Sequence, residues 1–170
     1  MSEARPAEAR IRPAQPADIP AITRIYNEGI RDQATLESQE RSEDERLAWL
    51  QGRGERHPVL VAERDGAVAG WGSLNAFNPR EAYRHVADFS VYVAREARGM
   101  GVGSALLPAL IALARELGYH KMVLAGFPAN EVSVRLYRRF GFREVGIYRE
   151  QGQLDGRWVD VIIMEKLLGE

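Results

Sequence analysis

The chain lacks cysteine altogether, so none of its 170 residues can form a disulfide, supply a thiolate to a metal or act as a cysteine nucleophile. Histidine is scarce as well, with three residues, so a histidine metal cluster is disfavoured and we predict no metal. No apolar run approaches the roughly 20 residues of a membrane span. A net charge of -1 gives the chain no overall attraction to nucleic acid or to an anionic membrane. We therefore expect neither of these partners, and we expect a cytoplasmic location.

The length and an apolar content of 45% are ordinary for one globular domain. The first ten residues are polar and do not contain the apolar segment of a secretory signal. We expect residues 1–9 to form a disordered N-terminal tail and residues 10–168 to form a single domain.

The most informative stretch is Arg98 to Gly103, which reads Arg-Gly-Met-Gly-Val-Gly and is called the glycine loop below. It lies between a strand-like run, 86–93, and a helix-like run, 104–117. Glycines let backbone N–H groups approach a ligand closely, and a helix that begins here directs its unpaired N–H groups and positive dipole end to the same place. The stretch therefore predicts a pocket for a pyrophosphate or a similar anion.

The spacing of this loop excludes two common phosphate-binding motifs. A Rossmann fingerprint has G-x-G-x-x-G near the start of a βαβ unit, whereas these glycines lie at 99, 101 and 103, past mid-chain. A Walker loop places Lys-Ser or Lys-Thr after its last glycine, whereas Gly103 is followed by Ser104-Ala105. The residues fit Arg/Gln-x-x-Gly-x-Gly/Ala instead.

Hydrophobic periodicity and turn signals predict the order βααβββαβαββ. Helices are expected after Asp18 as N-cap, after a capping box of Ser42 and Glu45, after the glycine loop, and over 131–140. The expected strands are 9–12, 59–63, 67–74, 86–93, 121–125, 142–148 and 158–165.

The loop pattern and this order of elements resemble the GNAT superfamily of N-acetyltransferases over roughly residues 10–168, and most of all its phosphinothricin and methionine sulfone acetyltransferase branch. The resemblance implies an α/β (α+β) fold with a central mixed, mostly antiparallel sheet flanked by helices. Besides the glycine loop, it is carried by Ile25-Tyr26-Asn27-Glu28, Tyr83-Arg84-His85, Phe89-Ser90-Val91-Tyr92-Val93, Asn130 through Phe142, and Gly156-Arg157-Trp158-Val159-Asp160.

The resemblance also implies an activity. Acetyl-CoA would be the co-substrate, and the acetyl group would pass to the amine of a small amino-acid-like acceptor such as phosphinothricin, methionine sulfoximine or methionine sulfone. Transfer would be direct within a ternary complex, because no cysteine can hold the acyl group. A homodimer is expected from the resemblance. The alternatives are an acceptor that is a protein N-terminus, a polyamine or an aminoglycoside, and a CoA-binding sensor without turnover.

Residues for acetyl-CoA binding follow from the same resemblance, which assigns them to strand 86–93, the glycine loop and the helix after Pro128. The resemblance implies that this strand splays from its neighbour and that its backbone pairs with the pantetheine arm. From the residues themselves, Asn130 is expected to cap that helix by accepting from the N–H of Ser133, and a cap alone is the alternative. The full set is Val91, Tyr92, Val93, Arg98, Gly99, Met100, Gly101, Val102, Gly103, Ser104, Asn130 and Ser133.

Two residues are candidates for catalysis. Amine acylation needs a base. Strand alternation places Asp88 on one face with Ser90 and Tyr92, and this strand runs directly into the glycine loop. The resembled branch usually has glutamate at this position, and the shorter aspartate favours a water relay. The alternatives are that Asp88 orients the substrate or caps a turn. The resemblance implies that Tyr137 protonates the leaving thiolate, and a core-edge aromatic is the alternative.

Three further residues are candidates for substrate binding. A guanidinium can bind a carboxylate through two hydrogen bonds, and amino-acid acceptors carry a carboxylate. The resembled branch uses an aromatic–arginine pair here, which corresponds to Tyr83 and Arg84, and a solvated loop arginine is the alternative. Arg31 begins the loop that would cover the substrate.

Overall fold

The computed structural model describes residues 8–169, so most of the predicted tail, 1–9, lies outside the described residues. The elements follow the predicted order βααβββαβαββ. Their bounds are β1 (Arg10–Pro13), α1 (Ile19–Arg31), α2 (Glu43–Gln51), β2 (Val59–Arg64), β3 (Ala67–Ala76), β4 (Val86–Val93), α3 (Val102–Glu116), β5 (Lys121–Gly126), α4 (Glu131–Arg139), β6 (Arg143–Leu154) and β7 (Arg157–Leu167). Single 3-10 turns occur at η1 (Pro16–Asp18), η2 (Glu81–Tyr83) and η3 (Arg95–Ala97).

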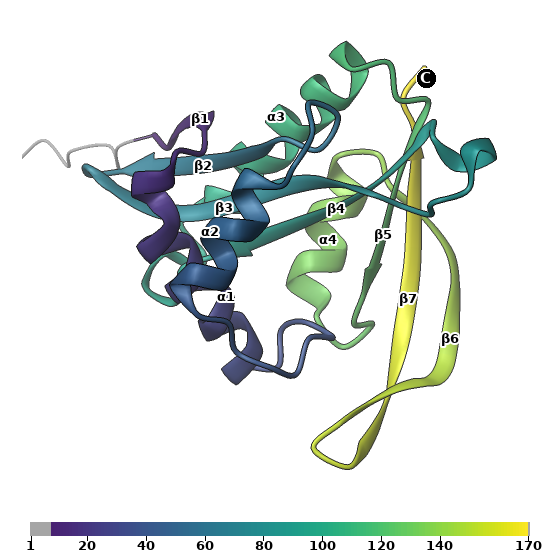
Figure 1. The fold of residues 1–170 in the computed structure, drawn as a ribbon. Helices are drawn as coiled ribbons and strands as arrows, with labels where there is room; N and C mark the ends of the chain where they lie inside the picture. Colours follow the sequence, from purple (N-terminus) through teal and green to yellow (C-terminus); the bar gives the residue numbers. More distant parts are fainter. Residues whose placement is uncertain (1–7, 170) are drawn as a thin grey trace, which may run out of the picture.

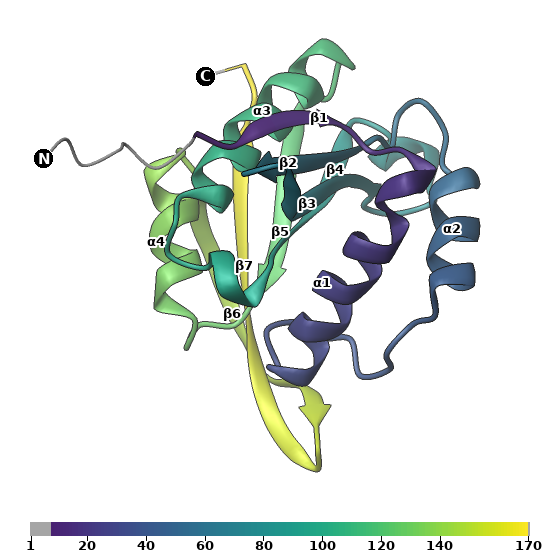
Figure 2. The same ribbon diagram turned by 90° about the vertical axis from the view of Figure 1, so that its left-hand side faces the viewer.

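One seven-stranded sheet with the order β1-β2-β3-β4-β5-β7-β6 forms the centre of the fold. Every neighbouring pair is antiparallel except β4 and β5, so the predicted mixed, mostly antiparallel sheet is confirmed. Helices α1 and α2 cover one face, and α3 and α4 cover the other (Figure 2).

The parallel pair is short. β4 and β5 are in register only where Val86–Asp88 face Lys121–Val123, although β4 continues to Val93 and β5 to Gly126. Beyond Asp88 the two strands diverge, and α4 lies beside the gap (Figure 1). The sheet therefore opens at its centre, along the side of β4 that faces β5.

Two glycines of β3 allow α3 to lie close to the sheet. A Cβ at Gly70 would lie 2.7 Å from Val102 Cγ1, and a Cβ at Gly72 would lie 2.8 Å from Leu110 Cδ1. Both distances are shorter than real Cβ contacts, so larger residues would displace α3. Close packing at Gly70 fixes the first residue of α3, which sets the position of the glycine loop.

The helix starts agree with the predicted caps, with one correction. Ser42 and Glu45 form the predicted capping box of α2. Asp18 stands at the N-cap of α1, but its side chain does not cap that helix. Its carboxylate is buried against Arg12 at 2.7 Å and accepts from the N–H of Gln15, and the hydrogen bonds from Arg12 lower the pKa of Asp18. The Asp18 carboxylate is therefore engaged by Arg12, six positions earlier, and by Gln15, rather than by the first turn of α1.

The last two strands are longer than predicted: β6 runs to Leu154 rather than to 148, and β7 spans Arg157–Leu167 rather than 158–165. The far half of β6 is exposed except near its end, where Leu154 is buried, and its register shifts between Tyr148 and Gly152, so it has no apolar alternation to detect. No helix within the described part of the chain is long and apolar enough to cross a membrane.

Candidate active site

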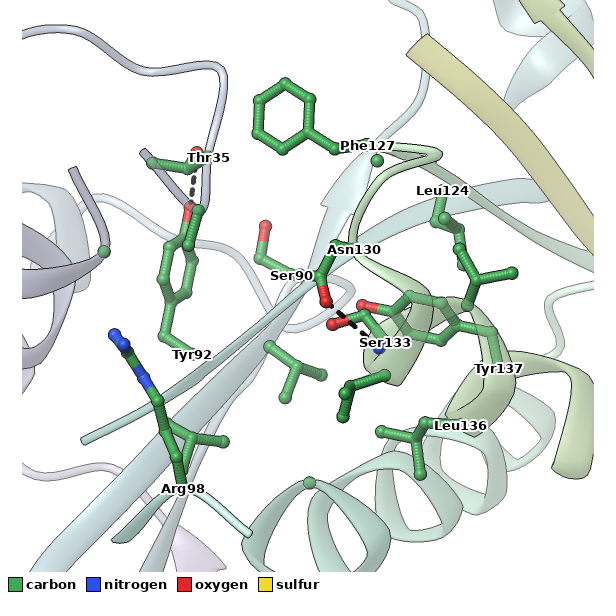
Figure 3. A pocket seen from close by; sticks show the side chains of 18 of the residues that line it. Thr35, Ser90, Tyr92, Arg98, Leu124, Phe127, Asn130, Ser133, Leu136 and Tyr137 are labelled. Carbon is green, nitrogen blue, oxygen red and sulfur yellow. Dashed lines mark hydrogen bonds between the residues drawn. The ribbon is translucent and has the colours of Figure 1, made fainter. Parts of the chain in front are cut away.

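The divergence of β4 from β5 opens a cavity of about 1110 Å³ (Figure 3). Its wall comes from β4, the glycine loop, the first turn of α3, the end of β5 and one face of α4, with the loop after α1 opposite. A volume of this order suits a large organic ligand. Of the candidate residues, the cavity wall contains Asp88, Val91, Tyr92, Val93, Arg98, Gly99, Gly101, Val102, Gly103, Ser104, Asn130, Ser133 and Tyr137.

The glycine loop presents backbone to the cavity. Gly99 and Gly101 adopt φ angles of +75° and +83°, in the left-handed region that favours glycine, and no heavy atom lies within 4 Å of a Cβ built at either position. Within residues 8–169, no side chain caps the N-terminus of α3, and its first turn carries no acidic residue. The N–H groups of this turn and the positive end of the helix dipole are therefore available to an anion.

Acidic residues at and just after the end of α1 bind the first residue of this loop and the segment before it. Asp32 accepts from Arg98 Nη2 at 2.7 Å and from Arg95 Nη2 at 2.8 Å, and these bonds lower the pKa of Asp32, with Arg95 contributing most. The buried Glu28 accepts from the backbone N–H of Arg95 at 2.9 Å. The sequence analysis gave neither acidic residue a role, although Glu28 lies in a stretch that carries the resemblance, because their partners lie more than 60 positions away.

Tyr92 is held firmly on the α1 side of β4. Its ring stacks on Trp71 with centroids 4.7 Å apart, and its hydroxyl lies 3.4 Å from Thr35 Oγ1. A Cβ at Gly29 would lie 3.3 Å from the ring, so α1 packs directly on it. Thr35 comes from the loop after α1 and lines the cavity together with Leu36 and Glu37. That loop therefore forms the wall opposite the glycine loop.

Asp88 lies at the point where β4 and β5 separate. Burial raises its pKa to about 6, and hydrogen bonds from Asn75 and from the backbone of Phe89 oppose that rise. Asn75 Nδ2 lies 3.3 Å from Asp88 Oδ2. Because this pKa lies close to neutral pH, the carboxyl group can exchange a proton under ordinary conditions.

Tyr137 reaches the same cavity from α4 (Figure 3). Its ring packs edge-to-face on Phe89 and Phe142, with centroids 5.9 Å and 6.1 Å away. Burial raises the pKa of Tyr137 to about 12, so its hydroxyl keeps its proton at neutral pH and can donate it. The structure therefore brings Asp88 and Tyr137, which are 49 positions apart, into one cavity wall.

Asn130 forms the predicted cap, and its Oδ1 accepts from the N–H of Ser133 at 3.2 Å (Figure 3). Position 103 leaves little room for a side chain, because a Cβ there would lie 3.1 Å from Leu136 Cδ2. The first turn of α3 therefore packs against α4. This contact brings the glycine loop and the Asn130 end of α4 to the same side of the cavity.

Four candidate residues lie outside the cavity wall. Tyr83 packs edge-to-face on Phe77 at 5.5 Å, and Arg84 Nε lies 3.3 Å from Glu81 Oε1 on the exposed loop of η2. Arg31 pairs with Glu40 at 2.8 Å. The fourth residue, Met100, has an exposed side chain. Their assigned roles in binding stay predictions.

A second, smaller cavity of about 600 Å³ lies beside the first. The two cavities share the wall residues Ala34, Phe127 and Asn130. The β6–β7 hairpin closes its far side with Leu154 and the exposed Trp158. Two cavities with a common wall can hold two reactants side by side, one beside the glycine loop and one beneath the hairpin.

Comparisons with known proteins show which family has this sequence pattern and fold. Residues 21–142 match the model of the acetyltransferase (GNAT) family. An L-methionine sulfoximine/L-methionine sulfone acetyltransferase of Pseudomonas paraeruginosa is 38% identical over 160 residues, which cover 92% of this chain and 93% of that protein.

Two solved structures are similar over nearly their whole length. A ribosomal-protein-alanine N-acetyltransferase from Brucella melitensis has a TM-score of 0.90 and 41% identity, covering 93% of this chain and 99% of that one. A phosphinothricin acetyltransferase from Sinorhizobium meliloti, in complex with AcCoA, has a TM-score of 0.87 and 36% identity, covering 95% and 89%.

Proposed function

Because this chain belongs to the acetyltransferase (GNAT) family, we propose that it transfers an acetyl group from acetyl-CoA to the amine of a small amino-acid-like acceptor. Phosphinothricin, methionine sulfoximine and methionine sulfone are the acceptor types, since proteins named for them are similar over most of the chain. The observation that carries the proposal is one cavity wall that combines an anion-binding loop, an unpaired strand edge, Asp88 and Tyr137.

The residues present fit acetyl-CoA. Its pyrophosphate suits the uncapped N-terminus of α3 and the glycine loop, where Gly99 and Gly101 keep the backbone open. Its pantetheine arm carries amide groups, and the side of β4 beyond Asp88 has no partner strand, so Val91 to Val93 offer backbone donors and acceptors. Asn130 borders the same space.

Bound acetyl-CoA supplies an acetyl group activated as a thioester. At a pH above about 6 the Asp88 carboxylate is mostly ionised and accepts the proton that the attacking amine must lose, directly or through one water. The Tyr137 hydroxyl keeps its proton and donates it to the departing sulfur. One proton leaves the amine and one reaches the thiolate, so the reaction balances; afterwards Asp88 loses its proton to water and Tyr137 regains one, which restores both side chains.

A second candidate acceptor is the N-terminal amine of a protein, because the similar Brucella melitensis structure is named a ribosomal-protein-alanine N-acetyltransferase. The family and the role of the cavity would be unchanged. The two candidates differ only in the acceptor that would occupy the smaller cavity and contact the loop after α1.

Release of free thiol from acetyl-CoA tests both candidates. The chain has no cysteine, so CoA is the only new thiol. We expect release that depends on phosphinothricin, methionine sulfoximine or methionine sulfone. Release only with a peptide that begins with alanine would move the assignment to a protein acceptor. Binding of acetyl-CoA without release across these amines and a polyamine would favour the sensor and overturn the proposal.

The role of Arg84 is tested in the same assay. If Arg84 binds the acceptor carboxylate, Arg84→Ala raises KM for the amino acid and leaves KM for acetyl-CoA unchanged. Arg80→Ala is the matched control, since Arg80 is an exposed arginine of the same loop. Equal KM values in the two variants would remove the carboxylate role.

A further inference from the structure

A polar cluster lies between β3 and β4 beneath the candidate base; we call it the Asn75 cluster. It comprises Arg53, Ser73, Asn75, Asp88 and Ser90. Asn75 stands directly opposite Asp88 in the antiparallel register, and Ser73 stands opposite Ser90. Asn75 is the centre of the cluster, because its amide bonds to each of the other four side chains.

The partners of Asn75 determine which way its amide points. Arg53 Nη2 lies 2.8 Å from Oδ1, and a guanidinium can only donate. Ser73 Oγ lies 3.0 Å from the same oxygen. The other end of the amide is therefore the NH₂ group, which donates to Asp88 Oδ2 at 3.3 Å and to Ser90 Oγ at 3.2 Å.

Arg53 is itself fixed. Its Nε donates to the carbonyl of His57 at 2.7 Å, its Nη2 also donates to the carbonyl of Leu74, and its guanidinium lies 4.5 Å from the centre of the Trp49 ring. Burial lowers the pKa of Arg53 to about 10, which still leaves it protonated at neutral pH. Arg53 therefore remains a donor, and the amide of Asn75 cannot turn over without losing that bond.

We propose that Asn75, oriented by Arg53, is the positioning residue that holds the Asp88 carboxylate and the Ser90 hydroxyl in the cavity wall, where β4 separates from β5. The inference rests on the proposed function, in which Asp88 accepts the proton of the attacking amine. Neither Asn75 nor Arg53 lines the cavity, so both act through Asp88 and Ser90 rather than on a substrate.

The proposal has a definite electrostatic consequence. Asp88 faces Asn75 from β3, Val123 from β5 and Ser90 on its own strand, while Tyr137 of α4 borders the same cavity. The shift in its pKa comes from burial and two N–H donors, with no contribution from a charged side chain. An N–H donor favours the ionised carboxylate. Loss of the Asn75 N–H therefore raises the pKa of Asp88 above about 6.

The test compares Asn75→Leu, which keeps the approximate size, with Asn75→Asp, which replaces the N–H donor by a second carboxyl oxygen. We expect the acid limb of kcat/KM to move to higher pH by roughly half a unit or more in Asn75→Leu, and further in Asn75→Asp because a like charge is added. KM for acetyl-CoA should not change. Arg53→Lys should shift the limb in the same direction, since one ammonium nitrogen cannot reproduce the positions of Nε and Nη2, which together reach three oxygens.

Asn27→Leu is the matched control. The amide of Asn27 is buried and makes two bonds of 2.9 Å to the backbone of Arg41, so the variant loses comparable bonds without touching the Asn75 cluster. It should lower stability and leave the acid limb in place. A limb that moves equally in Asn27→Leu would assign the effect to general loosening and overturn the proposal.

A second readout does not depend on activity. The ¹³C signal of the Asp88 carboxyl, assigned by its loss in Asp88→Asn, is titrated in the protein alone. A higher midpoint in Asn75→Leu than in the parent supports the positioning role even where no amine is acetylated. An unchanged midpoint overturns it. Absence of amine-dependent thiol release by the parent protein would instead remove the proposed function, so the two failures are distinguishable.

Discussion

At the scale of single residues, the site depends on two ionisable groups whose surroundings move their pKa values in useful directions. Burial raises the pKa of Asp88 to about 6 and that of Tyr137 to about 12. Asp88 is thus ready to accept a proton just above that pH, and Tyr137 is ready to give one at any neutral pH. The strand alternation indicated the face of Asp88, but not this burial.

Asp88→Asn should lower kcat/KM by about 100-fold, because an amide of the same shape cannot accept the proton. The variant should also lose the rise in activity through about pH 6. The pH dependence of thiol release measures both effects, with acetyl-CoA affinity as the control for an intact cavity. Activity within a few-fold of the parent would exclude Asp88 as the base.

The same variant should be more stable at high pH. The pKa of Asp88 is raised in the folded state from an ordinary 3.8 to about 6. Its contribution to stability is therefore complete below about pH 4 and is lost as the pH rises to about 6. Asparagine cannot ionise, so at about pH 8 Asp88→Asn should melt roughly 3 °C or more above the parent. Thermal unfolding at several pH values measures this gap, which should close near pH 4.

Tyr137→Phe should lower kcat at least about tenfold, since it removes the proton donor and keeps the ring between Phe89 and Phe142. KM for acetyl-CoA should change little. Tyr119→Phe is the control: Tyr119 is buried, but its hydroxyl donates to the carbonyl of Arg56 outside the cavity wall. Similar kcat values for the two variants would argue against Tyr137 as the acid.

At the scale of elements, the site depends on where α3 begins and where β4 leaves β5. The glycine loop could be predicted because glycine spacing and a following helix are local signals. The divergence has no local signal, because both strands read as ordinary strands; only the family resemblance implied it, and the strand contacts confirm that pairing stops after Asp88. The longer β6 was missed for a related reason, since most of its far half is exposed and shows no alternation of apolar residues.

Gly101→Ala should weaken acetyl-CoA binding about tenfold, because the left-handed φ of +83° is strained for alanine and the backbone of the loop would shift. Gly118→Ala provides a matched control at the other end of α3, with φ +78° and equally open space around a Cβ. Both changes should cost about 1–2 kcal/mol of stability. Calorimetric titration separates them: equal affinities would show that the loop does not bind the cofactor.

At the scale of the whole molecule, the outer strand of the sheet is exposed. β6 forms one edge of the sheet and carries exposed apolar side chains at Val145, Ile147 and Tyr148, with Trp158 on the neighbouring β7. Apolar side chains gathered on a free strand edge are typical of an interaction surface. This surface is consistent with the predicted homodimer, which stays a prediction together with the cytoplasmic location.

Light scattering after gel filtration should give about twice the chain mass of 19.1 kDa. A double change, Val145→Asp with Ile147→Asp, should give a monomer if β6 forms the interface, since it would bury two unpaired charges. Val132→Asp, at a residue of α4 that is 75% exposed, should leave the mass unchanged. A parent protein of single-chain mass at micromolar concentration would exclude the dimer.

The sequence by itself determined the order of the elements, the glycine loop and the face of β4 that carries Asp88, because turns, caps and periodicity act between residues close together in the chain. Only the tertiary structure decided how these parts meet. Pairing between β4 and β5 stops after Asp88. The ion pair of Asp32 with Arg98 and the hydrogen bond from Asn75 to Asp88 also link residues far apart or on different strands. Such contacts depend on packing and burial, which no local pattern encodes.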